Sequence, residues 1–148
     1  MSEALTPAEI MGQVVFRCIY NKYTCLDPER VQLLMYYIRN QFMSERGVPG
    51  FEEPIYATAR GPRMESVRDQ LRHYKGSIPY SEIKKIYPKC KGFDLKTAAL
   101  IYRVVDPTGN MSNNMLLELA NRQRPFQKAL LSRSHLIRPE ETLKFFSR

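Results

Sequence analysis

The sequence has few of the residues on which most enzymes and metal proteins depend. It contains two histidines, three cysteines and no tryptophan. His73 and His135 lie far apart with no patterned cysteine or carboxylate beside them, and the cysteines match no zinc or redox spacing. The seven glycines are scattered singly, so they form no phosphate-binding loop, and no serine lies in a Gly-x-Ser-x-Gly elbow. We therefore expect no catalytic residue, no metal site and no cofactor.

Long apolar runs are also missing. No stretch approaches the ~20 apolar residues that a membrane-spanning helix needs. The start, Met1-Ser2-Glu3-Ala4, has neither a basic region nor an apolar region of an export signal, so we expect a cytoplasmic protein without a membrane partner. Cys18, Cys25 and Cys90 are then expected to be reduced thiols, with Cys18 in the core.

Charge is plentiful but uneven. The chain carries a net charge of +8, and most of it comes from two segments. Residues 60–103 hold eleven basic residues against four acidic ones, and residues 122–148 hold seven against two. Such asymmetry indicates an acidic protein partner or a nucleic-acid backbone, and the alternative is a solvated basic face that binds nothing.

Helix signals run through the whole chain. Thr6-Pro7-Ala8-Glu9 is a capping box with proline at the first helical position, and Asp27-Pro28 repeats this arrangement before an apolar stripe that ends at Gly47. Asp94 and Ser112 are predicted to cap two later helices. Other helices are expected over Met64–Tyr74, over Ser81–Tyr87, from Pro125 and from Pro139.

A minor β element is expected between the second and third helices. Pro54 disfavours helix in the residue before it, and the residues that follow favour an extended strand over Glu53–Thr58. Gly61-Pro62 is predicted to be an exposed, rigid turn, with strand limited to residues near Glu53–Arg60. The expected fold is therefore mainly α, with about seven helices and a minor β element, in a single compact domain over residues 1–148.

The order of motifs from Val31 to Pro62 resembles the Panacea, or SocA-like antitoxin, domain. That family has a pattern close to LQKLLYYA, then a glycine, then F-x-E-P-I-x-A-W and YGPV. The matching residues here are Gln32, Leu34, Tyr36, Tyr37, Phe51, Glu53, Pro54, Ile55, Ala57, Gly61 and Pro62. Similarities continue to the C-terminal Phe145-Phe146, so the resemblance covers roughly residues 10–146. The chain departs from the pattern at Leu33, Thr58, Arg60 and Arg63, which replace a lysine, a tryptophan, a tyrosine and a valine.

The resemblance implies a Panacea-like domain in a bacterial or phage protein that binds and neutralises a cognate protein toxin by direct contact, without catalysis. It also leaves open a proteolytic adaptor that delivers the bound toxin to a host protease. Two further alternatives are a phage or mobile-element inhibitor of a host factor and a nucleic-acid-binding regulator that uses the basic face.

Arg60, Arg63, Arg68 and Arg72 are predicted to form part of the partner-binding face. Arginine is enriched at interfaces, where it can make bidentate contacts to carboxylates, and these four flank the predicted Gly61-Pro62 turn. Tyr36 is added as an amphipathic contact at the rim, whereas its neighbour Tyr37 is expected to be buried. The predicted partner is an acidic protein.

Overall fold

The fold is mainly helical. The computed structural model describes residues 6–22, 26–79, 82 and 94–146. Within these residues it has seven α-helices, one 3-10 helix and a two-stranded antiparallel sheet in a single compact domain, which confirms the predicted fold class. The elements are α1 (Pro7–Tyr20), α2 (Pro28–Arg46), β1 (Tyr56–Thr58), β2 (Gly61–Arg63), α3 (Glu65–Leu71), α5 (Leu95–Val105), η2 (Asp106–Asn110), α6 (Asn113–Asn121), α7 (Arg124–Leu131) and α8 (Pro139–Phe146). The helix expected over Ser81–Tyr87 lies, apart from Glu82, outside the described residues.

The predicted helix caps are present. The Thr6 hydroxyl accepts a hydrogen bond from the Glu9 amide at 3.2 Å, and the Glu9 carboxylate accepts one from the Thr6 amide at 3.0 Å. Asp27 accepts a hydrogen bond from the Arg30 amide at 2.8 Å, and Gly47 ends α2 in the left-handed conformation with φ 71°. Asp94 and Ser112 cap α5 and α6 as expected. Local sequence therefore sets where these helices begin.

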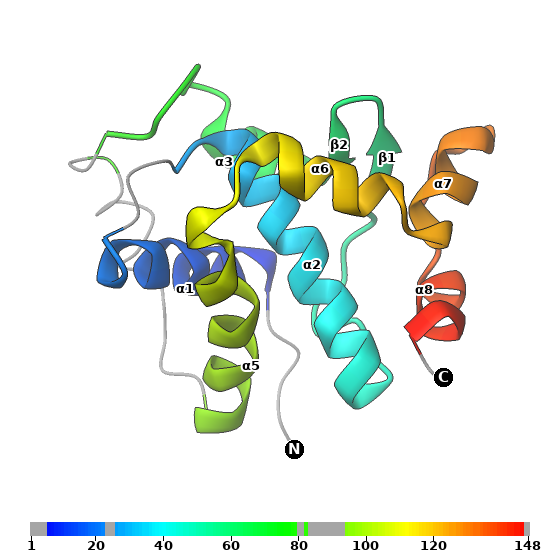
Figure 1. The fold of residues 1–148 in the computed structure, drawn as a ribbon, viewed down its shortest axis with the longest axis horizontal. Coiled ribbons are helices and arrows are strands. Elements are labelled where there is room, and N and C mark those ends of the chain that lie inside the picture. The colour runs from blue at the N-terminus through cyan, green and yellow to red at the C-terminus, as the bar shows by residue number, and fades with distance from the viewer. Residues whose placement is uncertain (1–5, 23–25, 80–81, 83–93, 147–148) are drawn as a thin grey trace.

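Helix α2 is the centre of the domain. It packs against α1, α3, α5, α6, α8 and β2, and Figure 1 shows it running diagonally through the middle of the molecule. Most of its residues are buried, including two arginines. A helix that is covered on nearly every side acts as the scaffold to which the other elements attach.

The small sheet differs from its prediction in two respects. The first is its extent, because strand was expected only near Glu53–Arg60 whereas β2 lies beyond that limit. The second is the exposure of the Gly-Pro pair. Gly61 and Pro62 are buried in β2, and the exposed residues of the connection are Ala59 and Arg60. The prediction of an exposed Gly-Pro turn was therefore wrong. Gly61 has φ 113°, and a Cβ atom there would lie 3.1 Å from Cδ1 of Leu117, so this backbone approaches α6 closely. The Gly-Pro dipeptide predicted a turn, but here the missing side chain of Gly61 allows the strand to pack closely against α6.

Candidate partner-binding site

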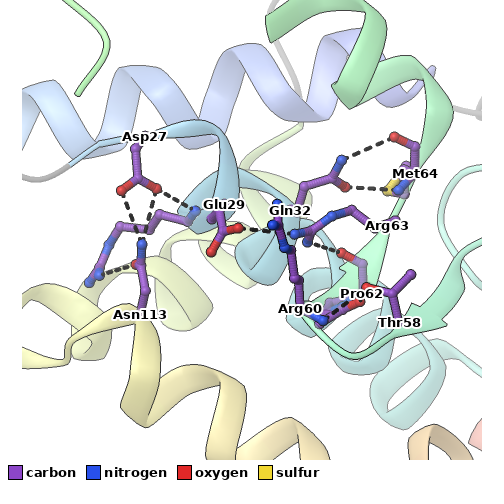
Figure 2. Close-up of polar contacts among 11 residues, drawn as sticks. Asp27, Glu29, Gln32, Thr58, Arg60, Pro62, Arg63, Met64 and Asn113 are labelled. Atoms are coloured by element: carbon purple, nitrogen blue, oxygen red, sulfur yellow. Dashed lines mark hydrogen bonds and ion pairs between the residues drawn. The ribbon is translucent and has the colours of Figure 1, made fainter. Parts of the chain in front are cut away.

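The hairpin that carries Arg60 is fixed to α2 through the residue that follows β2. The side-chain amide of Gln32 donates to the Met64 carbonyl at 3.1 Å and accepts from the Met64 amide at 2.8 Å (Figure 2). Both groups are buried, so each bond satisfies a backbone group that water cannot reach. At the connection, the Thr58 hydroxyl donates to the Gly61 carbonyl at 2.8 Å and accepts from the Arg60 amide at 3.2 Å. The hairpin is thus held at its base and at its tip.

A second polar cluster holds the start of α2 against α6. The side-chain amide of Asn113 donates to both carboxylate oxygens of Asp27 at 3.1 Å (Figure 2). The oxygen of the same amide accepts from Nη1 of Arg30 at 3.0 Å. Arg30 also donates to the Thr108 carbonyl. The buried guanidinium thereby joins three elements, α2, η2 and α6.

Arg63 is the member of the predicted face that the protein uses internally. Its Nη2 atom lies 3.1 Å from Oε1 of Glu29, and its Nη1 atom donates to the Pro62 carbonyl at 2.9 Å (Figure 2). Only 25% of its side chain is exposed. Arg63 therefore contributes to the attachment of the hairpin to α2 and offers little surface to a partner.

The other three predicted arginines are exposed. Arg60 lies in the hairpin connection, and no hydrogen bond or ion pair joins its side chain to another described residue. The same is true of Arg72, which directly follows α3. Arg68 is 66% exposed and has only a long contact of 3.5 Å to Asp69. Arg68 and Arg72 are four residues apart in helical geometry, so they lie on the same side of α3.

The exposed face of α3 carries charges of both signs. Glu65 and Asp69 are exposed beside Arg68 and Arg72, whereas Val67 and Leu71 point into the core. The helix and the Arg72 that follows it therefore present two acidic and two basic side chains to solvent. The basic character of residues 60–75 comes mainly from Arg60, at the hairpin tip, and the exposed Lys75. Lys84, Lys85, Lys89 and Lys91, which raise the charge of the sequence segment, lie outside the described residues.

The burial of the two adjacent tyrosines is the reverse of the prediction, because Tyr36 is the more deeply buried of the two. Tyr36 is only 1% exposed and packs edge-on against Phe126, and its hydroxyl donates to Oε1 of Gln123 at 2.5 Å. Burial raises the pKa of Tyr36 to about 12. Tyr37 is half-buried and donates to the Leu116 carbonyl at 2.5 Å. The placement of Tyr36 at an exposed rim was therefore wrong, because α6 and α7 cover the side of α2 on which it lies.

Two buried arginines were not anticipated from the sequence. Arg39 is 1% exposed, donates to the Ile137 carbonyl at 3.0 Å, and leaves its Nε atom without a hydrogen-bond partner. Burial lowers the pKa of Arg39 to about 10. For Arg39, the signal that could have revealed its burial is that its neighbours three and four positions away along the helix, Met35, Tyr36, Phe42 and Met43, are all apolar or aromatic.

The described residues offer little for acid–base or nucleophilic chemistry. Cys18 is buried as predicted, and burial raises the pKa of its thiol to about 11, which disfavours the reactive thiolate. His73 and His135 are both exposed. The Glu53 carboxylate accepts the Ser66 amide at 3.0 Å and so stabilises the start of α3, a structural role. Among residues 6–22, 26–79, 82 and 94–146, no group of three His, Cys, Asp or Glu side chains could hold a metal ion. Cys25 and Cys90 lie outside these ranges.

Comparison with known proteins gives no relative from which a role could be transferred. No family profile, no curated protein and no solved structure matches this chain. Across the part of the chain that the structure describes, no helix is long and apolar enough to cross a membrane.

Proposed function

We propose that this protein is an antitoxin-type binding protein that neutralises a cognate protein toxin by direct contact. The proposal rests on the Panacea-like order of motifs in the sequence and on the exposed arginines of the hairpin and α3. Its binding face consists of Arg60, Arg68 and Arg72. Arg63 and Tyr36 are left out of this face, because the first is paired with Glu29 and the second is buried.

The observation that carries the proposal is the state of Arg60 and Arg72. Both are exposed, and neither side chain is paired with another described residue. A guanidinium in this state can make a bidentate contact to a carboxylate without first breaking an internal bond. The partner we propose is therefore a protein with an acidic surface.

The anchoring of the hairpin adds to this argument. Gln32 and Glu29 hold the segment from Arg63 to Met64 on α2, and Thr58 closes the connection that carries Arg60. A segment that is already ordered loses less conformational freedom when it binds. Neutralisation would follow from covering the active surface of the toxin, and a stable complex would bury on the order of 1,600 Å² in total.

The mixed charge of α3 favours a protein partner over a nucleic acid. Glu65 and Asp69 are exposed next to Arg68 and Arg72, and they would repel a phosphate backbone that approached this helix. A protein surface with both acidic and basic groups could pair with all four side chains. Alternating charges also help to reject wrong partners.

The test is rescue from toxicity when this protein is produced together with the product of each adjacent gene. We expect one such product to be toxic alone and harmless in the presence of the wild-type chain. The triple variant R60E/R68E/R72E should remain folded, since exposed charges contribute little stability, and should lose the rescue. The matched control is Arg133→Glu, a charge reversal at an exposed site in another segment.

Three results would count against the proposal. Full rescue by the folded triple variant would remove the assigned face. Rescue that disappears in a host without its cytoplasmic proteases would replace direct neutralisation by proteolytic delivery. Absence of any toxic partner, together with nucleic-acid binding that weakens steeply with salt and is lost in the triple variant, would replace the antitoxin by a nucleic-acid-binding regulator.

A further inference from the structure

A second basic segment lies at the C-terminal end of the sequence. Residues 122–148 hold seven basic residues against two acidic ones, and the proposed function does not use them. Between α7 and α8, which Figure 1 shows next to each other, there is a hollow of about 280 Å³. It is lined by Arg124, Pro125, Lys128, Glu141, Lys144 and Phe145.

The charges around this hollow do not balance. Nζ of Lys128 lies 2.8 Å from Oε1 of Glu141, and this contact compensates one of the three cations. The side chains of Arg124 and Lys144 make no hydrogen bond or ion pair with another described residue. The pKa of Glu141 is lowered first by the hydrogen bond from Lys128, against a smaller effect of desolvation, and also by the charges of Lys144 and Arg124. One carboxylate thus lies in the field of three cations, and two positive charges remain.

The walls of the hollow indicate what kind of anion it would accept. Arg124 and Pro125 form the first turn of α7, where the helix dipole favours negative charge. Pro125 and Phe145 add apolar surface beside the cations. The volume lies just below the ~300–1,000 Å³ of pockets for drug-sized ligands, so the hollow has room for a ligand smaller than a drug-sized molecule.

We infer that the hollow between α7 and α8 is a binding site for a phosphate monoester. Arg124 and Lys144 would contact the phosphate, and Pro125 and Phe145 would contact the organic group. Glu141 would act as an internal competitor that holds Lys128 away from the ligand. This inference stands on different residues from the proposed function and is independent of it.

The test is a titration of the full chain by isothermal calorimetry and by amide chemical shifts. The probes are phenyl phosphate, inorganic phosphate, phenol, and vesicles containing phosphatidic acid. We expect phenyl phosphate to bind, inorganic phosphate to bind more weakly, and phenol not to bind. Shifts should be centred on residues 124–128 and 141–145. If phosphatidic acid vesicles saturate the protein and phenyl phosphate does not, the protein binds the phosphate of a lipid headgroup at a membrane surface. That result would overturn the small-molecule site.

Three variants decide whether the named residues carry the binding. Arg124→Ala and Lys144→Ala should each weaken the binding of phenyl phosphate by about tenfold, which is the effect of losing one charge-assisted hydrogen bond. Glu141→Gln should increase the affinity for phenyl phosphate several-fold, because this substitution removes the competing carboxylate and frees Lys128. A gain in affinity cannot result from loss of structure, so this variant keeps the test decisive if the others unfold.

The matched control is Arg133→Ala, which removes an exposed positive charge from the same basic segment without touching the hollow. It should leave the affinity within about twofold, since exposed charges are screened by salt. An equal loss in Arg133→Ala would indicate a general attraction to net charge and would overturn the site. So would unchanged or weaker binding in Glu141→Gln, or no binding of phenyl phosphate at millimolar concentration.

Discussion

Nη2 of Arg63, the last residue of β2, lies 3.1 Å from Oε1 of Glu29 in the first turn of α2. The sequence predicted that Arg63 contacts a partner protein. In the structure it instead forms an ion pair with a carboxylate of its own chain. Together with the buried contacts of Gln32, this ion pair links the end of the hairpin to the helix that supports it. Arg68, five residues later, is mostly exposed and makes only a long contact to Asp69, so the two arginines lie in different environments.

This difference predicts unequal effects of charge reversal. Arg63→Glu should lower the free energy of unfolding by about 1 kcal/mol, because it breaks the pair and places two carboxylates side by side. Arg68→Glu should change it by no more than about 0.5 kcal/mol, as expected of an exposed residue with a 3.5 Å contact. Urea unfolding at low salt would measure both, and added salt should reduce the loss in Arg63→Glu. Equal losses in the two variants would contradict the structural role of Arg63.

Gly61 is expected to tolerate no side chain. Its φ of 113° is strained for any other residue, and a Cβ atom would lie 3.1 Å from Leu117. Gly61→Ala should therefore destabilise the protein by about 1–3 kcal/mol. Gly76→Ala is the matched control, because a Cβ atom there meets nothing within 4 Å, and it should be neutral or slightly stabilising. Thermal unfolding of the two variants compares them directly, and a neutral Gly61→Ala would exclude the close approach to α6.

Acid should remove the contribution of the Arg17–Asp106 ion pair to the stability of the fold. Nε and Nη2 of Arg17 each donate to a different oxygen of Asp106 at 2.8 Å, and this hydrogen bonding is the main cause that lowers the pKa of Asp106. A carboxylate with a lowered pKa in the folded state stabilises the fold above its unfolded pKa of about 3.9 and loses that effect as the pH falls further. The carboxylate is 40% exposed, so solvent screening limits the expected contribution to about 1 kcal/mol.

Asp106→Asn is the variant that tests this pH dependence. At pH 7 it should be less stable than the wild type by up to about 1 kcal/mol, and the difference should shrink as the pH drops below about 4. Glu118→Gln, which loses only an exposed pair with Arg122, should show little difference at either pH. The measurement is urea unfolding at several pH values. A difference that stays constant down to pH 2 would show that the charge of Asp106 does not matter.

Tyr36 should affect stability and leave partner binding unchanged. Tyr36→Phe removes a partly buried hydrogen bond to Gln123, while the bond from Asn40 to the same oxygen at 3.2 Å remains. We expect a loss of about 1 kcal/mol in unfolding free energy. Tyr56→Phe, at an exposed position, should be neutral. The affinity of the folded variant for its partner, once identified, should equal that of the wild type, and a clear loss would return Tyr36 to the binding face.

The local sequence was sufficient to predict most helix starts. Thr6, Asp27, Asp94 and Ser112 cap their helices as predicted, because a cap depends on hydrogen bonds between residues two or three positions apart. The mainly helical class and the burial of Cys18 follow from apolar spacing in the same way. The candidate site could be predicted only in part, since Arg60, Arg68 and Arg72 are exposed as expected whereas Arg63 and Tyr36 are not.

What only the tertiary structure decided depends on contacts between residues far apart in the sequence. Tyr36 is buried and Tyr37 half-buried because α6 and α7, some eighty residues later, cover that side of α2. Gly61-Pro62 became a buried strand because Leu117 lies against it, although the dipeptide by itself favours a turn. Arg63 is paired because Glu29 lies across from it. Spacing and caps thus determined the elements of this protein, and long-range packing determined which side chains remain free to bind.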